Sequence, residues 1–293
     1  MKVHFIGIGG IGLSALARFL NFDGHEVSGS DMKSSLITKA LEDEGIKVFC
    51  PQSETNIKDD FDLVIYSAAV TDENPELIEA RLKQIRTLSR KEALPIILGD
   101  KKNYCVAGAH GKSTTTAILA SILQSSALIG AISKDFGSNF RYVNDLIAFE
   151  ADESDASFLL SNPYCAIVTN AEPEHMEYYH YDYDKFYESY ETFLSLAKKR
   201  VVNGEDKDIQ KLKIEDATYL YPSKDIKNLC YTLKDGQPCT KFDLKDFVIV
   251  ADSGLMNAEN INELEKNNYK YIIGARIKNE NQTVREWILS QNK

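Results

Sequence analysis

The sequence predicts an α/β protein with parallel sheets, arranged as two domains and a short tail. Over the first hundred residues, apolar strand-like runs alternate with helical segments, which is typical of a parallel sheet. Two glycine-rich loops, 7–12 and 108–113, each lie between a strand-like run and a helical segment. A length of 293 residues is enough for two domains that each bury a core.

The first glycine loop opens the chain. An apolar strand pattern over 2–6 runs into Gly7-Ile-Gly9-Gly-Ile-Gly12, which fits G-x-G-x-x-G, and a helix is expected over 13–21. Glycines at this spacing allow a tight turn and a close approach of the backbone to phosphate. Asp31 follows a strand expected over 26–30, where an acid usually binds a ribose hydroxyl. The loop and Asp31 predict a nucleotide site, and the alternative is a tight turn without a ligand.

The first domain is expected to span residues 1–100 and to be Rossmann-like. Further strands are expected over 47–49 and 62–67, further helices over 36–44 and 75–84, and an exit segment over 87–94. Ligands of parallel sheets bind at the carboxyl ends of the strands. Gly9, Asp31 and Ser67 are all expected at that edge.

The second glycine loop opens the second domain. Tyr104–Ala107 is an apolar strand pattern, Gly108-Ala-His-Gly-Lys-Ser113 follows, and a helix is expected over 117–123. Such a loop presents backbone N–H groups to an anion, while Lys112 reaches the phosphates and Ser113 binds Mg²⁺. The full phosphate-loop pattern needs glycine at position 106, which is valine here. The alternative is a glycine-rich turn with a solvated lysine.

Acidic residues follow the next expected strand, 146–150. Glu150 ends that strand and is the expected second Mg²⁺ contact, with Asp152 or Glu153 as alternatives. The acids at 152–155 also fit the N-terminus of a helix. His175 follows a strand expected over 165–169 and could bind a second metal ion, although a lone histidine is more often a surface or packing residue.

Composition limits the classes of partner. The net charge of −10 and the pI near 5.1 argue against a basic nucleic-acid surface. No apolar run reaches eighteen residues, so no membrane span is expected. The five cysteines are scattered without metal or redox spacing, and the chain starts directly in a strand pattern. Reduced thiols and a cytoplasmic location are therefore expected.

Taken together, these motifs resemble the Mur ligase family of cell-wall synthesis. The resemblance covers about residues 1–246 and rests on Gly7–Gly12, Ser67-Ala-Ala69, Gly108–Thr115, Glu150–Phe158 and Thr169–Met176. Ala109 and Ser113 stand where the family usually has threonines, and Glu174 where it usually has aspartate. Serine still offers Mg²⁺ a hydroxyl.

The resemblance implies a reaction and its sites. It is strongest to the branch that joins L-alanine to UDP-N-acetylmuramate, using Mg²⁺ and ATP, through an acyl phosphate. The UDP-sugar would be held by Gly7, Gly9, Gly10, Ile11, Gly12, Asp31, Ser67 and Ala68. ATP would be held by Gly108, Ala109, His110, Gly111, Lys112, Ser113, Thr114 and Asn170. Lys112, Glu150 and His175 would be catalytic, with Ser113, Glu150 and His175 on the metal ions.

The end of the chain departs from the family. The central ATP-binding domain, 101–246, is expected to be incomplete and the C-terminal ligase domain absent. Residues 247–293 resemble a fragment of a DDE insertion-sequence transposase, with Asp252 matching one of three metal-binding acids. Strands are expected over 247–254 and 269–276, and a helix over 257–268. A gene fusion or insertion that truncated a ligase is the favoured origin; alternatively, the tail replaces part of the central sheet, or the similarity arises by chance.

Three alternatives to a full ligase follow from this departure. The chain is expected to have little or no ligase activity. It could instead bind UDP-sugar or nucleotide without turnover, or be a remnant whose tail disturbs the fold. The related enzyme that re-attaches recycled peptide to the same sugar is a further alternative.

Overall fold

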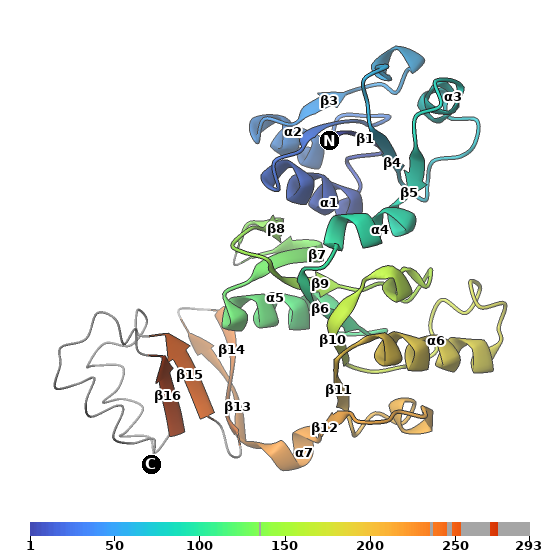
Figure 1. Cartoon of the computed structure of the whole chain (residues 1–293). Helices are drawn as coiled ribbons and strands as arrows, with labels where there is room; N and C mark the ends of the chain where they lie inside the picture. The colour runs from blue at the N-terminus through green and yellow to red at the C-terminus, as the bar shows by residue number, and fades with distance from the viewer. Residues whose placement is uncertain (135, 235–236, 245–247, 253–269, 275–293) are drawn as a thin grey trace, which may run out of the picture. The chain divides into compact units, whose positions relative to one another are not determined.

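The computed structural model describes residues 1–134, 136–234, 237–244, 248–252 and 270–274. The chain divides into two compact units, Met1–Leu220 and Tyr221–Lys293. Figure 1 shows the helices and strands of both units, coloured from the N-terminus to the C-terminus.

The first sheet of unit Met1–Leu220 confirms the predicted parallel α/β fold. Its strand order is β3-β2-β1-β4-β5, and all its neighbouring strands are parallel. The strands are β1 (Lys2–Ile6), β2 (Glu26–Ser30), β3 (Lys47–Phe49), β4 (Leu63–Tyr66) and β5 (Thr87–Ser89). The helical segments are α1 (Ile11–Phe22), α2 (Leu36–Asp43), η1 (Glu54–Asn56), α3 (Pro75–Leu82) and α4 (Arg90–Leu98). The order reverses at β1, which is where such sheets bind ligands.

The segment expected to lead the chain out of this sheet contains a strand, β5, and the start of a helix, α4. Residues 87–94 are not a simple connection, because β5 pairs with β4 and α4 begins directly after it. Ser89 caps α4: its hydroxyl accepts from the Glu92 backbone N–H, and the Glu92 carboxylate accepts from the Ser89 N–H. This capping box is visible in the sequence as Ser-x-x-Glu.

The second sheet of the same unit is mixed. Its order is β12-β11-β10-β6-β9-β7-β8, and only β7 and β8 are antiparallel among these pairs. Its strands are β6 (Lys102–Ala107), β7 (Ser126–Ser133), β8 (Ser138–Arg141), β9 (Leu146–Glu150), β10 (Pro163–Val168), β11 (Lys199–Asn203) and β12 (Thr218–Leu220). The helical segments are α5 (Lys112–Leu123), η2 (Ser157–Leu160), α6 (Tyr183–Leu196) and η3 (Ile209–Lys211).

Two local features of this part of the chain depend on specific contacts. Gly137, Ser138 and Asn139 form a polar stretch that by itself favours a loop, yet Ser138–Arg141 pair with β7, and Asn139 and Phe140 are buried. Their tertiary contacts override the polar local sequence. Helix α6 begins at Tyr183, because the Asp182 side chain caps it by accepting from the Lys185 N–H.

A hydrophobic core runs through both sheets of the first unit. Helix α1 contributes Leu13, Leu16 and Phe19, which belong to the same buried cluster as Leu128 and Phe149 of the second sheet. Burying a side chain of this size contributes about 1.5–3 kcal/mol. The core therefore fixes the first glycine loop, at the start of α1, relative to the second sheet. The domain boundaries from the sequence stay predictions.

The unit Tyr221–Lys293 contains α7 (Pro222–Asp225), the antiparallel pair β13 (Ile226–Lys234) and β14 (Gln237–Leu244), and the parallel pair β15 (Val248–Asp252) and β16 (Lys270–Gly274). The two strands expected in the tail are present, and the helix expected over 257–268 lies outside the described residues. The origin of the tail stays a prediction. In the described parts of the whole chain, no helix is both long enough and apolar enough to cross a membrane.

A buried carboxylate ties together the first sheet. Glu76 of α3 is fully buried, and its Oε1 accepts from Asn56 Nδ2 at 2.6 Å and from the Ser53 N–H at 3.1 Å. Its Oε2 accepts from the Ser30 hydroxyl and lies 3.6 Å from His4 Nε2. Burial raises the pKa of Glu76, but contacts with His4, Ser30 and Asn56 outweigh burial and hold that pKa below its ordinary value.

This network predicts a pH-dependent contribution to stability. Because the pKa of Glu76 is lower in the folded chain, its stabilisation is present above the unfolded pKa, about 4.5, and is lost as pH falls through the folded value. We expect Glu76→Gln to lower the free energy of unfolding by about 1–3 kcal/mol at pH 7. The difference from the wild type should shrink below pH 4.5. Urea unfolding between pH 7 and 3 measures this difference in unfolding free energy. Glu26→Gln, at an exposed position, is the control. A difference between the wild type and Glu76→Gln that stays the same at every pH would contradict the prediction.

Candidate functional site

Hydrogen bonds hold the first glycine loop against the end of β2. The N–H groups of Gly7 and Ile8 donate to the Ser30 carbonyl at 2.8 and 2.9 Å, and the Gly9 N–H donates to Asp31 Oδ2 at 2.9 Å. A Cβ added at Gly9 would lie 2.8 Å from that same oxygen, so glycine lets the acid approach. The structure thus brings the loop and Asp31 together, with Asp31 as an anchor of the loop.

A cavity of about 620 Å³ opens beside this loop. Four of the residues predicted for the UDP-sugar line it, namely Gly7, Gly10, Asp31 and Ser67. They come from the carboxyl ends of β1, β2 and β4, where the strand order reverses. The position is therefore the one expected for a ligand of a doubly wound sheet.

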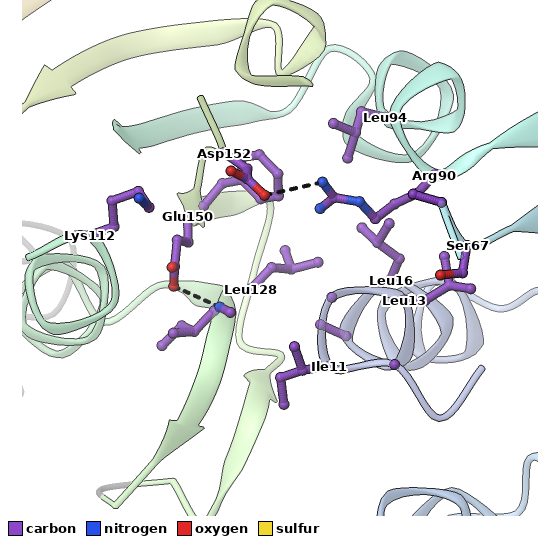
Figure 2. A pocket seen from close by; sticks show the side chains of 17 residues that line it. Ile11, Leu13, Leu16, Ser67, Arg90, Leu94, Lys112, Leu128, Glu150 and Asp152 are labelled. Atoms are coloured by element: carbon purple, nitrogen blue, oxygen red, sulfur yellow. Dashed lines mark hydrogen bonds and ion pairs between the residues drawn. The ribbon is translucent and has the colours of Figure 1, made fainter. Parts of the chain in front are cut away.

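A second cavity, of about 350 Å³, is lined from both sheets. Ile11, Ser67 and Ala68 come from the first sheet and its glycine loop, whereas Lys112 and Glu150 come from the second (Figure 2). Gly10 and Gly12 also line it. Residues predicted for two different ligands therefore face one space.

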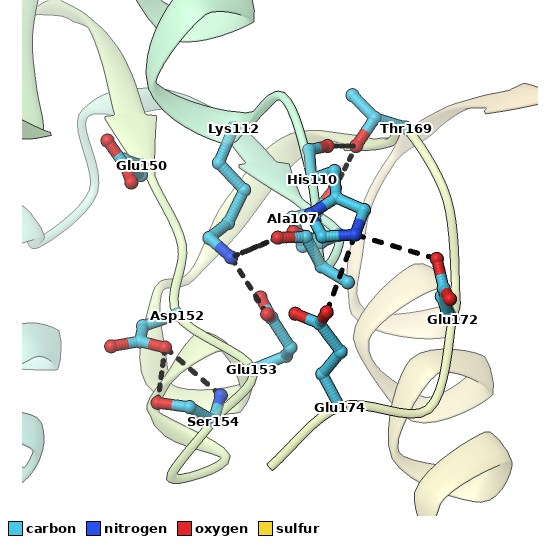
Figure 3. Close-up of polar contacts among 12 residues, drawn as sticks. Ala107, His110, Lys112, Glu150, Asp152, Glu153, Ser154, Thr169, Glu172 and Glu174 are labelled. Atoms are coloured by element: carbon cyan, nitrogen blue, oxygen red, sulfur yellow. Dashed lines mark hydrogen bonds and ion pairs between the residues drawn. The ribbon is translucent and has the colours of Figure 1, made fainter.

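The second glycine loop, 108–113, surrounds its own lysine. Lys112 Nζ donates to the Gly108 carbonyl at 2.8 Å and to Glu153 Oε1 at 2.8 Å (Figure 3). Glu153 is buried, and its Oε2 has no hydrogen-bond partner among the described residues. Gly108 has a φ of +133°, and a Cβ there would lie 2.3 Å from Thr169 Oγ1, so only glycine fits. The loop backbone and a buried acid thus hold Lys112 in place.

Glu150 contacts the hydroxyl at the start of α5. Ser113 Oγ donates to Glu150 Oε1 at 2.9 Å, and the Gly130 N–H donates to Glu150 Oε2 at 2.7 Å. Of the three acids considered for Mg²⁺, Glu150 is the one that touches Ser113; Glu153 pairs with Lys112 instead. Within the described residues there is no group of three or more His, Cys, Asp or Glu side chains placed to hold a metal ion.

The acids after β9 are arranged around an arginine. Arg90 Nη2 lies 3.4 Å from Asp152 Oδ2, 3.4 Å from Asp155 Oδ2 and 3.2 Å from Ser157 Oγ. Burial raises the pKa of Asp152, but hydrogen bonds from Ser154 and the charges of Arg90 and Lys112 lower it below its ordinary value. Residues 154 and 155 form a turn, and the short 3-10 helix η2 begins at Ser157, whose backbone N–H donates to Asp155 Oδ1 at 3.0 Å, so these acids do precede a helical turn.

Asn170, just after β10, contacts the backbone of the second glycine loop. Its Oδ1 accepts from the His110 N–H at 3.0 Å, and its Nδ2 donates to the His110 carbonyl at 2.8 Å. Thr169 Oγ1 donates to the same carbonyl at 2.7 Å. The exposed His110 ring lies 3.5 Å from Glu172 Oε2 and 3.4 Å from Glu174 Oε1 (Figure 3). Asn170 therefore acts here on the loop backbone.

His175 is exposed and has a left-handed backbone, with a φ of +52°. No hydrogen bond or ion pair among the described residues connects its side chain with Lys112, Ser113 or Glu150. The other predicted ATP residues, Ala109, Gly111 and Thr114, lie in the loop or the first turn of α5.

A buried latch that the sequence analysis missed joins α1 to β8. Asn139 Oδ1 accepts from Arg18 Nη1 at 2.6 Å, while Asn139 Nδ2 donates to the Ile11 carbonyl at 2.5 Å and to Ser14 Oγ at 3.0 Å. Arg18 also donates to both carboxylate oxygens of Glu44, at 2.6 and 2.9 Å. The latch fixes the start of α1, and hence one wall of the shared cavity. Nothing in the local sequence marks Asn139, whose partners are more than 120 residues away.

Comparison with known proteins identifies the family. Residues 2–102 match the Mur ligase family, catalytic domain. A UDP-N-acetylmuramate–L-alanine ligase of Campylobacter curvus is 58% identical over 246 residues, which cover 84% of this chain and 56% of that protein. The chain belongs to the Mur ligase family.

Two further similarities support this Mur ligase assignment. A protein of the same name from Campylobacter jejuni subsp. doylei is 52% identical over 292 residues, covering 95% of this chain and 66% of that protein, so this alignment enters the tail. The solved structure of the UDP-N-acetylmuramate-alanine ligase from Thermotoga maritima has a TM-score of 0.67 and 31% identity, over 75% of this chain and 53% of that chain. This Mur ligase chain therefore spans between about half and two thirds of the length of these relatives.

Proposed function

We propose that this chain carries the UDP-N-acetylmuramate and Mg·ATP sites of the ligase that joins L-alanine to that sugar. The observation that carries the proposal is the single cavity lined by Ser67 on one side and by Lys112 and Glu150 on the other. The names of the relatives with more than half of their aligned residues identical support the alanine-adding reaction over the peptide-recycling one.

The reaction needs two ligands to meet. The sugar carboxylate attacks the γ-phosphorus of ATP, which forms an acyl phosphate and breaks the bond to ADP. The amine of L-alanine then attacks the acyl carbon, phosphate leaves, and an amide forms with loss of the amine proton. Lys112, held by the Gly108 carbonyl and Glu153, offsets the negative charge that builds on the phosphoryl oxygens.

Ser113 and Glu150 are the proposed residues for Mg²⁺. A hydroxyl and a carboxylate are oxygen donors of the kind that Mg²⁺ prefers, and they are already 2.9 Å apart. The Gly130 N–H orients the carboxylate. When bound, the ion would neutralise phosphate charge. His175 is proposed as a ligand of a second ion.

This assignment predicts how metal dependence responds to substitution. Glu150→Gln keeps the shape of the side chain but removes its charge, so we expect about ten times more Mg²⁺ to be needed for half-maximal ATP binding. Ser113→Thr should stay close to the wild type, because it keeps the hydroxyl. Titration of ATP binding against Mg²⁺ by calorimetry measures both. An unchanged Mg²⁺ requirement in Glu150→Gln would contradict the assignment.

The proposed function is tested by binding and by turnover. We expect saturable binding of UDP-N-acetylmuramate, and of ATP in the presence of Mg²⁺. Failure to bind UDP-N-acetylmuramate would overturn the proposal. Alanine-dependent phosphate release then tests the separate prediction of impaired ligation. Release at a normal enzymatic rate would contradict impairment, and release with peptide but not with L-alanine would favour the recycling reaction.

A further inference from the structure

Arg90 is a cation in the shared cavity that the family resemblance did not assign to the site. It begins α4, directly after β5, and so belongs to the first sheet. It lines the same cavity as Ser67, Lys112 and Glu150 (Figure 2). Among the residues that line this cavity, Arg90 and Lys112 are the two basic ones.

The guanidinium of Arg90 uses only part of its hydrogen-bonding capacity. Nη2 makes all of its contacts with Asp152, Asp155 and Ser157, at 3.2–3.4 Å. Nη1 and Nε donate no hydrogen bond to any residue in the described part of the chain. A guanidinium has five N–H donors in a planar fork that suits a carboxylate. The two N–H groups of Nη1 therefore remain for a ligand on the edge of the guanidinium away from the acids.

The free side of Arg90 adjoins the first glycine loop. A Cβ added at Gly12 would lie 3.4 Å from Arg90 Nη1, which places this nitrogen beside the start of α1. Across the cavity lie Lys112 and Glu150, the proposed residues for the γ-phosphate and Mg²⁺. Arg90 thus stands between the place proposed for the UDP-sugar and the place proposed for the γ-phosphate.

We propose that Arg90 binds the carboxylate of the UDP-sugar and orients it toward the γ-phosphate, an inference that rests on the proposed function. The reacting carboxylate has to lie between the two ligand sites, which is where Arg90 presents its unused donors. Asp152 and Asp155 hold Arg90 through Nη2, so the N–H groups of Nη1, on the opposite edge beside Gly12, stay available to the ligand. Arg90 would be a substrate-binding residue in contact with the nucleophile.

The test compares two sugars that differ in the carboxylate. UDP-N-acetylglucosamine has the same nucleotide and ring but lacks the acidic ether group of UDP-N-acetylmuramate. We expect Arg90→Gln to weaken UDP-N-acetylmuramate binding about tenfold or more, and to change binding of UDP-N-acetylglucosamine and of Mg·ATP less than about twofold. Calorimetric titration of the whole chain gives the three affinities. Arg81→Gln, which removes an exposed ion pair with Asp72, is the matched control.

A second variant distinguishes two effects of Arg90→Gln: the loss of the Arg90 N–H donors and the unpaired negative charge left on Asp152. Arg90→Gln leaves Asp152 without its arginine, and that carboxylate would itself repel an anion. Arg90→Gln combined with Asp152→Asn restores the local net charge, and we expect the same loss for UDP-N-acetylmuramate. Recovery of binding in the double variant would overturn the assignment, and so would an equal loss for both sugars. A wild-type chain that binds neither UDP-sugar would overturn the proposed function together with this assignment.

Discussion

Replacing Lys112 with methionine should weaken Mg·ATP binding by about 10- to 100-fold. The expected loss corresponds to a charge-assisted hydrogen bond, about 1.5–3 kcal/mol. The lysine is already positioned, because it is held by the Gly108 carbonyl and Glu153 and is only 17% exposed. Calorimetric titration with ATP and Mg²⁺ measures the affinity, and Lys185→Met, at an exposed position, is the control.

Loss of Lys112 also leaves a carboxylate buried without its cation. Glu153 is 2% exposed, so Lys112→Met alone is expected to destabilise the fold. The double variant with Glu153→Gln removes that charge and should regain stability without regaining ATP affinity. ATP affinity like that of the wild type in a stable double variant would rule out Lys112 as a phosphate-binding residue.

The second large effect is expected at the latch between α1 and β8. Asn139→Leu keeps the volume of the side chain but removes the acceptor for Arg18 and the donors to Ile11 and Ser14. Because these groups are buried, we expect the free energy of unfolding to fall by about 2–4 kcal/mol. Urea unfolding, analysed with one m-value for the wild type and the variant, measures the difference in unfolding free energy.

An exposed asparagine provides the comparison for this variant. Asn144 lies in the loop between β8 and β9, and Asn144→Leu should cost less than about 1 kcal/mol, since water can replace its hydrogen bonds. UDP-sugar binding offers a second readout, because Asn139 holds the Ile11 carbonyl at the wall of the shared cavity. Equal stability of the Asn139 and Asn144 variants would show that the latch contributes little.

The parts of the fold that the sequence predicted are those with strong local signals. Apolar runs located β1 and β6, because strands of a parallel sheet are buried on both faces, and the glycine loops marked where each strand ends before a helix. Residues that the motifs assigned to the same site also lie in contact. Ser113 donates a hydrogen bond to Glu150, and the Gly9 N–H donates one to Asp31. Strands that follow one another in a parallel sheet bring their carboxyl ends to one edge, so these contacts follow from the order of the elements.

The parts that the sequence did not predict depend on contacts between distant segments. Asn139 looked like a loop residue, yet it is buried because Arg18 and Ile11, far away in the chain, need its amide. Arg90 looked like a residue of the exit segment, and only packing of the two sheets places it in the shared cavity. His175 was predicted from its position after a strand, but that position does not determine where its ring points.

We infer that the UDP-sugar and ATP meet in one cavity between the two glycine loops. A crystal structure of this chain with UDP-N-acetylmuramate, Mg²⁺ and a non-hydrolysable ATP analogue tests it most directly. We expect the sugar carboxylate to lie in the cavity lined by Ser67, Arg90 and Lys112, about 3–3.5 Å from the γ-phosphorus. Both ligands bound with the carboxylate outside this cavity, away from Arg90 and Lys112, would contradict it.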